Sequence, residues 1–450
     1  MGNCFGKKKG SQYQAVHGIY PDEINSRDSV LNEVEDNQPG AAEIRNVASL
    51  LGHNQQDVSD GIVTTNQSQH IHQGTLNFPF LVDARTRQWV SRSKTIFIMR
   101  GLPGSGKSTI VREIQKIYPG TEVCSADNFF IGEDGIYRFD SSLLPNAHNH
   151  CQEIADLKCK EGCHVIVIDN TNIMKWEMAP YLKLAHDVYH YIPVIVEPLT
   201  SWRKDPEVLA KKNSHNVTID LIQHKVNKLD DQRLTPIYYG WFMNELDSKE
   251  ICNKAWNCFQ NIVIGNQERR AAFISWISPE ENPDFNTVIE SHFKPMNSRV
   301  HCTANFLGNQ IHNIYHREEN VIASLGKVFS LQIISIIFTP RSIGVRVKLE
   351  AEQLQLFVKP EEEVQRVEGS LERGRSAHIT VRVAHKEDNK VTGKDVLNMC
   401  DMFYNGQYTE LNCSEGLLID YGFCQYEIVL SNPLSYDALF SGFYARNFKR

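Results

Sequence analysis

Apolar positions in the first half of the chain form short runs that alternate with segments of helical character. Four of these runs have the length and composition of buried strands: KTIFIMR (94–100), TEVCSAD (121–127), HVIVIDNTN (164–172) and YIPVIVEP (191–198). Strands that alternate with helices are typical of a parallel sheet covered by helices. The pattern therefore predicts an α/β domain here.

The pattern changes after about residue 270, where β-branched strands dominate and helices become fewer. These strands are SLQIISIIFTP (330–340), IGVRVKLE (343–350), AHITVRV (377–383) and LIDYGFCQYEIVLS (418–431). We expect an α+β domain of two lobes at residues 271–450, after an α/β domain at residues 76–270. Residues 1–75 are polar and poor in aromatic side chains, so they predict a disordered tail that buries too little apolar surface to fold.

Composition narrows the class of protein. Of the 450 residues, 41% are hydrophobic and 22% charged, which is typical of a soluble globular protein. The net charge of −7 argues against a protein that coats nucleic acid along its whole surface. The eleven cysteines include no Cys-x-x-Cys pair, which indicates reduced thiols and a cytoplasmic protein.

The N-terminus, MGNCFGKKKG, predicts attachment to a membrane through lipid. Gly2 becomes the first residue once Met1 is removed, Cys4 lies beside it, and Lys7–Lys9 follow. A myristoyl chain on Gly2 anchors a protein stably only with a second signal, here a palmitoyl chain on Cys4 or the three lysines. We therefore expect a protein held at the cytoplasmic face of a membrane.

Two His-x-Thr elements lie 77 residues apart, in segments of strand character. They are His301-Cys302-Thr303 and His378-Ile379-Thr380. Residues i and i+2 of a strand point the same way, so each element aims an imidazole and a hydroxyl into one space. Two facing copies suit acid–base hydrolysis of a phosphate diester, with the hydroxyls on the phosphoryl oxygens. A single copy would more often belong to an ordinary half-buried strand.

A second chemical signal is a phosphate-binding loop between the first strand and the helix after it. The segment from Gly101 to Ser108 matches G-x4-G-K-[ST]. In such loops the backbone N–H groups wrap phosphates, the lysine adds a charge and the hydroxyl binds Mg²⁺. We expect ATP or GTP with Mg²⁺ to bind at Gly101, Gly104, Ser105, Gly106, Lys107, Ser108 and Thr109.

Two carboxylates at strand ends accompany the loop. Asp127, in SADNFF, is placed as a kinase base would be, and Asp169 is placed to join Ser108 in the magnesium shell. The alternative for either residue is a cap or a turn at the end of a strand. Lys211, Lys212, Asn213 and His215 lie in a basic stretch that would either close over phosphates or form a solvated face.

Together these segments resemble the 2′,3′-cyclic-nucleotide 3′-phosphodiesterases of the two-histidine phosphoesterase superfamily. The resemblance spans residues 76–446. It rests on NFPFL, TIFIMRGLPGSGKST, SADNFF, DNTN, VEPLTSWR, PIYYGWF, HCTANF, GRSAHIT and SGFYARN, in that order. It implies a polynucleotide-kinase-like domain fused to a phosphodiesterase domain.

The resemblance also implies an activity and a site. Nucleoside or RNA-terminal 2′,3′-cyclic phosphates would be opened to 2′-phosphates without a cofactor. Thr303 and Thr380 would act beside His378 as base and His301 as acid, although the spacing alone does not order the pair. Phe306 would contact the nucleobase, and Val391 would help to place the attacking water.

Two other functions fit the same features. One is a bifunctional RNA-repair enzyme that also phosphorylates 5′-hydroxyl ends through the loop and Asp127. The other is a membrane-anchored scaffold that binds RNA or the cytoskeleton, with catalysis secondary. Two intact His-x-Thr elements favour catalysis, because a scaffold has no need of them.

Overall fold

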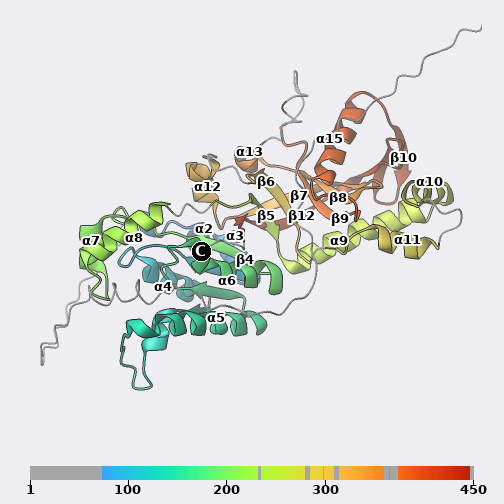
Figure 1. The fold of residues 1–450 in the computed structure, drawn as a ribbon. Coiled ribbons are helices and arrows are strands. Elements are labelled where there is room, and N and C mark those ends of the chain that lie inside the picture. Colours follow the sequence, from blue (N-terminus) through green and yellow to red (C-terminus); the bar gives the residue numbers. More distant parts are fainter. Residues whose placement is uncertain are drawn as a thin grey trace, which may run out of the picture. The chain divides into compact units, whose positions relative to one another are not determined.

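The computed structural model describes residues 73–231, 235–278, 284–296, 298–308, 314–358, 364 and 373–445 (Figure 1). Gly2, Cys4 and Lys7–Lys9 lie outside these residues, as does almost all of the expected tail, so the lipid anchor stays a prediction. Within the described ranges, no helix combines the length and the apolar character needed to cross a membrane.

The first half forms the predicted parallel sheet. Its strands are β1 (Thr95–Met99), β2 (Glu122–Cys124), β3 (Val165–Ile168) and β4 (Ile192–Val196), in the order β2-β3-β1-β4. All five residues of β1 are buried, and its apolar side chains alternate between two cores. Phe97 and Met99 join one core, and Ile96 and Ile98 join the other. A central strand buried on both faces explains the continuous apolar run in the sequence.

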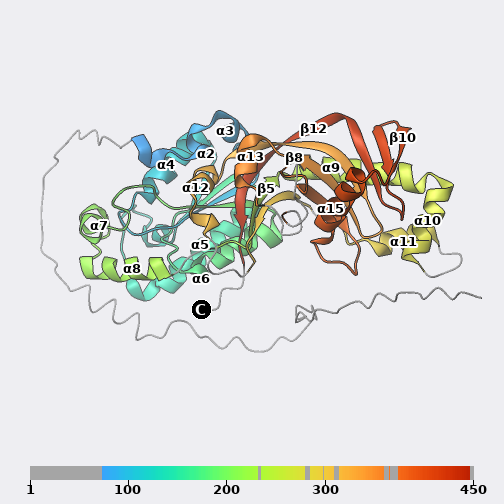
Figure 2. The ribbon, with the colours of Figure 1, turned by 90° about the horizontal axis from the view of Figure 1, so that it is seen from above.

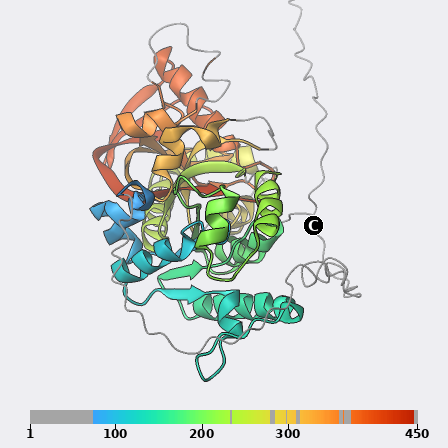
Figure 3. The same cartoon turned by 90° about the vertical axis from the view of Figure 1, so that its left-hand side faces the viewer.

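Helices and short helical turns surround this sheet. The longer helices are α4 (Lys107–Ile117), α5 (Leu144–Lys160), α6 (Lys175–Lys183), α7 (Pro206–Lys212) and α8 (Ile219–Asp231). The shorter elements are η1 (Gln73–Leu76), α2 (Pro79–Val82), α3 (Ala84–Val90), η2 (Ala126–Phe130), η3 (Ser141–Leu143) and η4 (Leu184–Val188). Helices α7 and α8, in light green, face the viewer in Figure 3.

The second half is built on a larger sheet. Its strands are β5 (Tyr238–Met243), β6 (His301–Phe306), β7 (Val328–Phe338), β8 (Ser342–Lys348), β9 (His378–Val383), β10 (Thr409–Cys413), β11 (Gly416–Asp420) and β12 (Tyr426–Phe443). Their order is β10-β11-β12-β5-β6-β9-β8-β7, and β12 also pairs with β7. Strand β5 belongs to this sheet, so the second half begins before the expected boundary at residue 270.

Helices cover the two faces of this sheet differently. The helical elements of this half are α9 (Glu245–Phe259), η5 (Gln260–Ile264), α10 (Gln267–Ile277), α11 (Phe285–His292), η6 (Tyr315–Arg317), α12 (Glu319–Ser324), α13 (Ala351–Leu356) and α15 (Val391–Tyr404). Ile251 and Phe259 of α9 share a core with Cys302 and Ile379, whereas α15 packs elsewhere through a cluster that includes Val396. Figure 2 shows α9, α10 and α11 in succession beside the second sheet.

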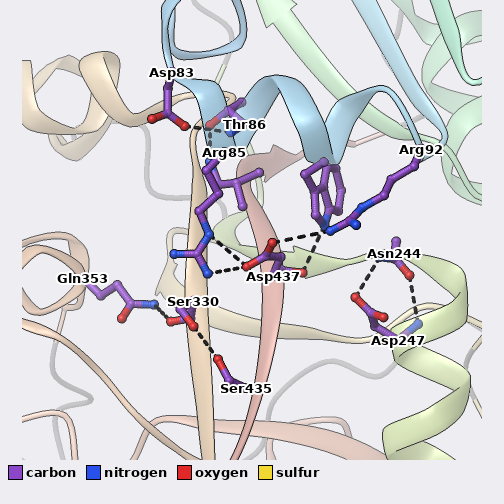
Figure 4. Close-up of polar contacts among 12 residues, drawn as sticks. Asp83, Arg85, Thr86, Arg92, Asn244, Asp247, Ser330, Gln353, Ser435 and Asp437 are labelled. Atoms are coloured by element: carbon purple, nitrogen blue, oxygen red, sulfur yellow. Dashed lines mark hydrogen bonds and ion pairs between the residues drawn. The ribbon is translucent and has the colours of Figure 1, made fainter.

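The long strand β12 joins the two halves. Its Asp437 accepts hydrogen bonds from Arg85 and Trp89 of α3, through a side-chain oxygen and the backbone carbonyl respectively (Figure 4). Further along, the Ser441 hydroxyl donates to the Pro193 carbonyl of β4 at 2.6 Å. Tyr444, just after β12, is buried in one core of the first sheet. Both polar and apolar contacts therefore connect the two sheets.

A buried ion pair lies in the second sheet, near α15. The Glu427 carboxylate, 1% exposed, accepts hydrogen bonds from the Arg346 guanidinium and the Tyr421 hydroxyl, both at 2.7 Å, and one from Ser335. Burial alone would raise the pKa of Glu427, but Arg346 and the hydroxyl donors hold it below its usual value. The folded state therefore favours the ionised carboxylate.

We predict that Glu427→Gln lowers stability by about 3 kcal/mol at pH 7, because it leaves a partly buried guanidinium without its counter-charge. A carboxyl whose pKa is lowered by folding stabilises the protein above its unfolded pKa and loses that effect as the pH falls through the folded pKa. Thermal melting should therefore show a gap between wild type and variant that narrows below about pH 4.5. The exposed Glu410→Gln is the control, and equal melting temperatures of the Glu427→Gln variant and wild type at pH 7 would contradict the prediction.

Candidate active site

The two His-x-Thr elements lie on neighbouring strands. β6 and β9 are antiparallel, with Cys302 opposite Ile379. This register sets His301 across from Thr380, and Thr303 across from His378. Both central residues are fully buried, and the histidines and threonines flanking them are half-buried. The structure thus gathers all four expected side chains on one face of the sheet.

The His378 ring is held from two sides. Its Nδ1 lies 2.7 Å from the Ser376 carbonyl oxygen, which can only accept a hydrogen bond. Nδ1 therefore carries the proton and Nε2 keeps its lone pair. On the other side lies Gly393 of α15, where an added Cβ would stand 2.9 Å from the ring Cε1. A side chain at residue 393 would displace the imidazole.

A buried carboxylate fixes α15 in this position. Asp395, 1% exposed, accepts hydrogen bonds from Thr339 Oγ1 at 2.7 Å and Ser342 Oγ at 2.9 Å, and it pairs with Arg341. Burial lowers the pKa of His378, and this outweighs the opposing effects of the Ser376 carbonyl and Asp395. The imidazole is therefore neutral near pH 7.

The His301 ring lies among aromatic side chains of β5. Its centroid is 4.8 Å from that of Tyr238, in a stacked arrangement, and 5.2 Å from that of Phe242. Burial, together with the positive charges of Arg299 and protonated His378, lowers the pKa of His301 to about 3. Without a bound anion, both histidines are thus neutral at physiological pH.

The two expected substrate-contacting residues are near the same face. Phe306 ends β6 and is 52% exposed, which is unusual for a phenylalanine side chain. Lys390 Nζ lies 4.9 Å from the centre of its ring. Val391 follows Lys390 as the first residue of α15, with its side chain buried. The structure therefore brings Phe306 and the start of α15 together.

The phosphate-binding loop has the backbone that its glycines predict. Gly104 and Gly106 have φ angles of 76° and 105°, a region that favours glycine. At Gly104 a Cβ would stand 2.8 Å from the Leu209 carbonyl of α7, so glycine also permits close packing there. The Lys107 ammonium is buried and donates to the Leu102 carbonyl at 3.0 Å. Burial lowers the pKa of Lys107 to about 8, against the opposing charges of Asp169 and Asp127.

The other residues of the loop make contacts with nearby side chains and backbone. Ser108 Oγ donates to Asp169 Oδ2 at 3.1 Å, which puts a hydroxyl and a carboxylate side by side. Ser105 Oγ is buried with no hydrogen-bond partner among the described residues, and Thr109 Oγ1 accepts from Arg112. Gly101 donates its N–H to the Thr171 carbonyl. Oxygen ligands of this kind fit Mg²⁺, and the loop N–H groups and Lys107 fit nucleotide phosphates.

Asp127 lies beside this loop with two partners that no sequence pattern connects to it. His215 Nε2 is 3.7 Å from Asp127 Oδ2, and the Tyr137 hydroxyl is 3.5 Å from Oδ1. The basic stretch from Lys211 to His215 is only partly helical: α7 ends at Lys212, and His215 is in the following loop. There the Asn213 side chain bonds five backbone groups and so shapes the loop.

Several residues around the two sites had no role assigned from the sequence. The DNTN segment is explained by Asn170 and Asn172, whose side chains bond the backbone of Ala126 and Met99 and so fix the strand ends. Thr200 and Trp202 bond carbonyls of the phosphate-binding loop. A glycine inside a helix or a strand often marks a place where another segment approaches closely. The glycines of VTGKD (391–395) and IGVRV (343–347) were therefore a signal in the sequence for the packing around His378.

Comparison with known proteins gives a separate match for each half of the chain. Residues 235–449 match the family model described as 2′,3′-cyclic nucleotide 3′-phosphodiesterase (CNP or CNPase), and residues 96–235 match an AAA domain model. NEDD4-binding protein 2 of Homo sapiens is 34% identical over 176 residues, which cover 38% of this chain and 10% of that protein.

Two other relatives match most of the chain. The 2′,3′-cyclic-nucleotide 3′-phosphodiesterase of Mus musculus is 31% identical over 377 residues, and that of Pongo abelii is 30% identical over 380 residues. Each match covers 82% of this chain and 88% of the relative. With its kinase-like first half and its phosphodiesterase second half, the chain belongs to the 2′,3′-cyclic-nucleotide 3′-phosphodiesterase family and is an enzyme of that class.

Proposed function

We propose that the second half hydrolyses 2′,3′-cyclic phosphates by acid–base catalysis between His378 and His301. The observation that carries the proposal is the cross-strand grouping of two imidazoles and two hydroxyls on one half-buried face. Groups that are held rigidly at the reacting centre need no rearrangement during the reaction, and this lowers the barrier. No metal ion takes part in the proposed steps.

His378 is the general base in this proposal. The Ser376 carbonyl fixes the proton on Nδ1, so Nε2 is free to take a proton from water. The resulting hydroxide attacks phosphorus, and the bond from phosphorus to the 3′ oxygen breaks. The hydroxyls of Thr303 and Thr380 donate to the phosphoryl oxygens as negative charge grows there.

His301 is the general acid. It gives a proton to the departing 3′ oxygen, and the product is a nucleoside 2′-phosphate with a free 3′-hydroxyl. The pKa of His301 is low in the free protein, but a bound phosphate anion favours the charged imidazolium and raises that pKa. Substrate binding thus creates the protonated acid that the reaction consumes.

The exposed ring of Phe306 supports nucleotide-sized substrates. Bases stack on aromatic side chains with about 1–3 kcal/mol each, whichever base is present. Lys390 beside the ring adds a positive charge near the mouth of the site. These features fit nucleoside or RNA-terminal 2′,3′-cyclic phosphates, with Phe306 under the base and the start of α15, at Val391, beside the attacking water.

We predict that His378→Ala and His301→Ala each lower kcat on a 2′,3′-cyclic mononucleotide by about 10²–10⁴-fold, the usual share of a general acid or base. Steady-state kinetics of the purified full chain measure the loss. His385→Ala, an exposed histidine after β9, should keep wild-type turnover. Retention of more than about one tenth of the activity in His378→Ala would contradict the proposed base.

For the first half we propose binding of ATP or GTP with Mg²⁺, and as a second activity the phosphorylation of 5′-hydroxyl ends. The bond between Ser108 and Asp169 favours the first, since both oxygens fit one Mg²⁺ shell. The position of Asp127 beside the loop, next to His215, favours the second. When bound, the nucleotide would supply the phosphoryl group, and Asp127 would accept the proton of the attacking hydroxyl.

We predict that Lys107→Ala weakens binding of labelled ATP at least about tenfold, through loss of a charged contact to phosphate. Hydrolysis of a cyclic mononucleotide by the same variant should stay within about twofold of wild type. Asp127→Asn should keep nucleotide binding but lose transfer of the γ-phosphate to a 5′-hydroxyl oligonucleotide. Transfer that survives in Asp127→Asn would remove Asp127 as the base, and absence of transfer in wild type would remove the kinase activity.

A further inference from the structure

Arg299 is a charged residue beside the proposed catalytic acid that no motif identified. It precedes β6 by two residues, and its guanidinium carbon lies 5.7 Å from the centre of the Phe242 ring. The same ring is 5.2 Å from the His301 ring. Arg299 is therefore packed into the aromatic group that surrounds the imidazole, although it was not among the expected site residues.

The same side chain reaches the kinase-like half. Arg299 Nη1 donates a hydrogen bond to the His190 carbonyl oxygen at 3.0 Å, across 109 residues of sequence. His190 lies between η4 and β4, with a φ angle of 57° that non-glycine residues seldom adopt. A backbone carbonyl in such a constrained connection is a fixed acceptor, so it holds the guanidinium in one place.

A row of aromatic rings makes a second connection between the halves at the same point. The His301 ring stacks on Tyr238 at 4.8 Å, Tyr238 stacks on Phe443 at 4.9 Å, and Phe443 contacts the His186 ring of η4 at 4.2 Å. Phe443 is the last residue of β12. The imidazole therefore belongs to a packed unit that includes residues of both halves.

We propose that Arg299 is a positioning residue for His301, held by the His190 carbonyl of the kinase-like half, so that contact between the two halves completes the phosphodiesterase site. The inference rests on the proposed role of His301 as acid. The guanidinium packs near the Phe242 ring and places a positive charge next to the imidazole. A fixed positive charge makes the imidazolium a stronger proton donor toward the departing oxygen.

The charges around this pair determine the sign of the effect. The charged groups that face His301 are Arg299 and His378, and the Tyr238 ring stacks on the imidazole. The groups that face Arg299 are Tyr238 and Glu245. Burial lowers the pKa of Arg299 to about 10, so the guanidinium stays charged at neutral pH. Removing the charge of Arg299 should therefore raise the pKa of His301 and move the pH limit of kcat/KM that His301 sets.

The test compares Arg299→Met, Arg299→Lys and Arg85→Met in the full chain. Nitrogen NMR of labelled histidine gives the pKa of His301, and kinetics on a 2′,3′-cyclic mononucleotide give kcat and KM against pH. In Arg299→Met we expect the pKa of His301, and with it the pH limit of kcat/KM that His301 sets, to rise by about one unit, a tenfold change in proton affinity. KM at neutral pH should change by less than about threefold, because a residue that acts only by positioning His301 makes no contact with substrate.

Two variants separate positioning from simple loss of structure. Arg299→Lys keeps the charge and should restore the pH limit to within about 0.3 units of wild type. Arg85→Met removes another contact between the halves, the one with Asp437, and should leave the pKa of His301 unchanged. The inference would be overturned if the pKa of His301 shifted equally in Arg85→Met, or if it did not change in Arg299→Met. It would also be overturned if KM of Arg299→Met rose about tenfold while the pKa of His301 stayed the same. Full activity of His301→Ala would instead refute the proposed acid.

Discussion

The pairing of β6 with β9 is the contact on which the candidate site depends. At its centre Cys302 faces Ile379, and both side chains are completely buried in the core shared with α9. Burial of such side chains contributes about 1.5–3 kcal/mol each and fixes which face of each strand points inward. The two histidines and two threonines must then share the opposite face. A slip of one residue in either strand would turn its pair into the core.

The surroundings of the two histidines differ, and the difference supports the separate roles proposed for them. His378 is held by a carbonyl and by the start of α15, with a buried carboxylate one turn further along the helix. His301 is held among rings and beside a guanidinium, without a nearby carboxylate in the part of the chain described. One environment leaves a nitrogen lone pair available, and the other favours release of a proton. The pair thus has the asymmetry that an acid and a base require.

Much of this arrangement could be predicted from the sequence, because it follows from local patterns. The alternation of strands and helices predicted the parallel sheet, and the spacing of His301 and Thr303 predicted a shared face. The register of β6 against β9, the membership of β5 in the second sheet and the approach of Gly393 to His378 depend on packing between distant segments. Arg299 was missed for the same reason: its partners are 57 and 109 residues away in the chain.

The reaction product is the most direct test of the central claim. Purified protein is given a 2′,3′-cyclic mononucleotide in ¹⁸O-labelled water with a metal chelator, and the product is analysed by phosphorus NMR and mass spectrometry. Attack of water activated by His378, with protonation of the 3′ oxygen by His301, predicts only the 2′-phosphate, with the label on phosphorus. A 3′-phosphate, a mixture of isomers, or no turnover until a metal is added would contradict the account.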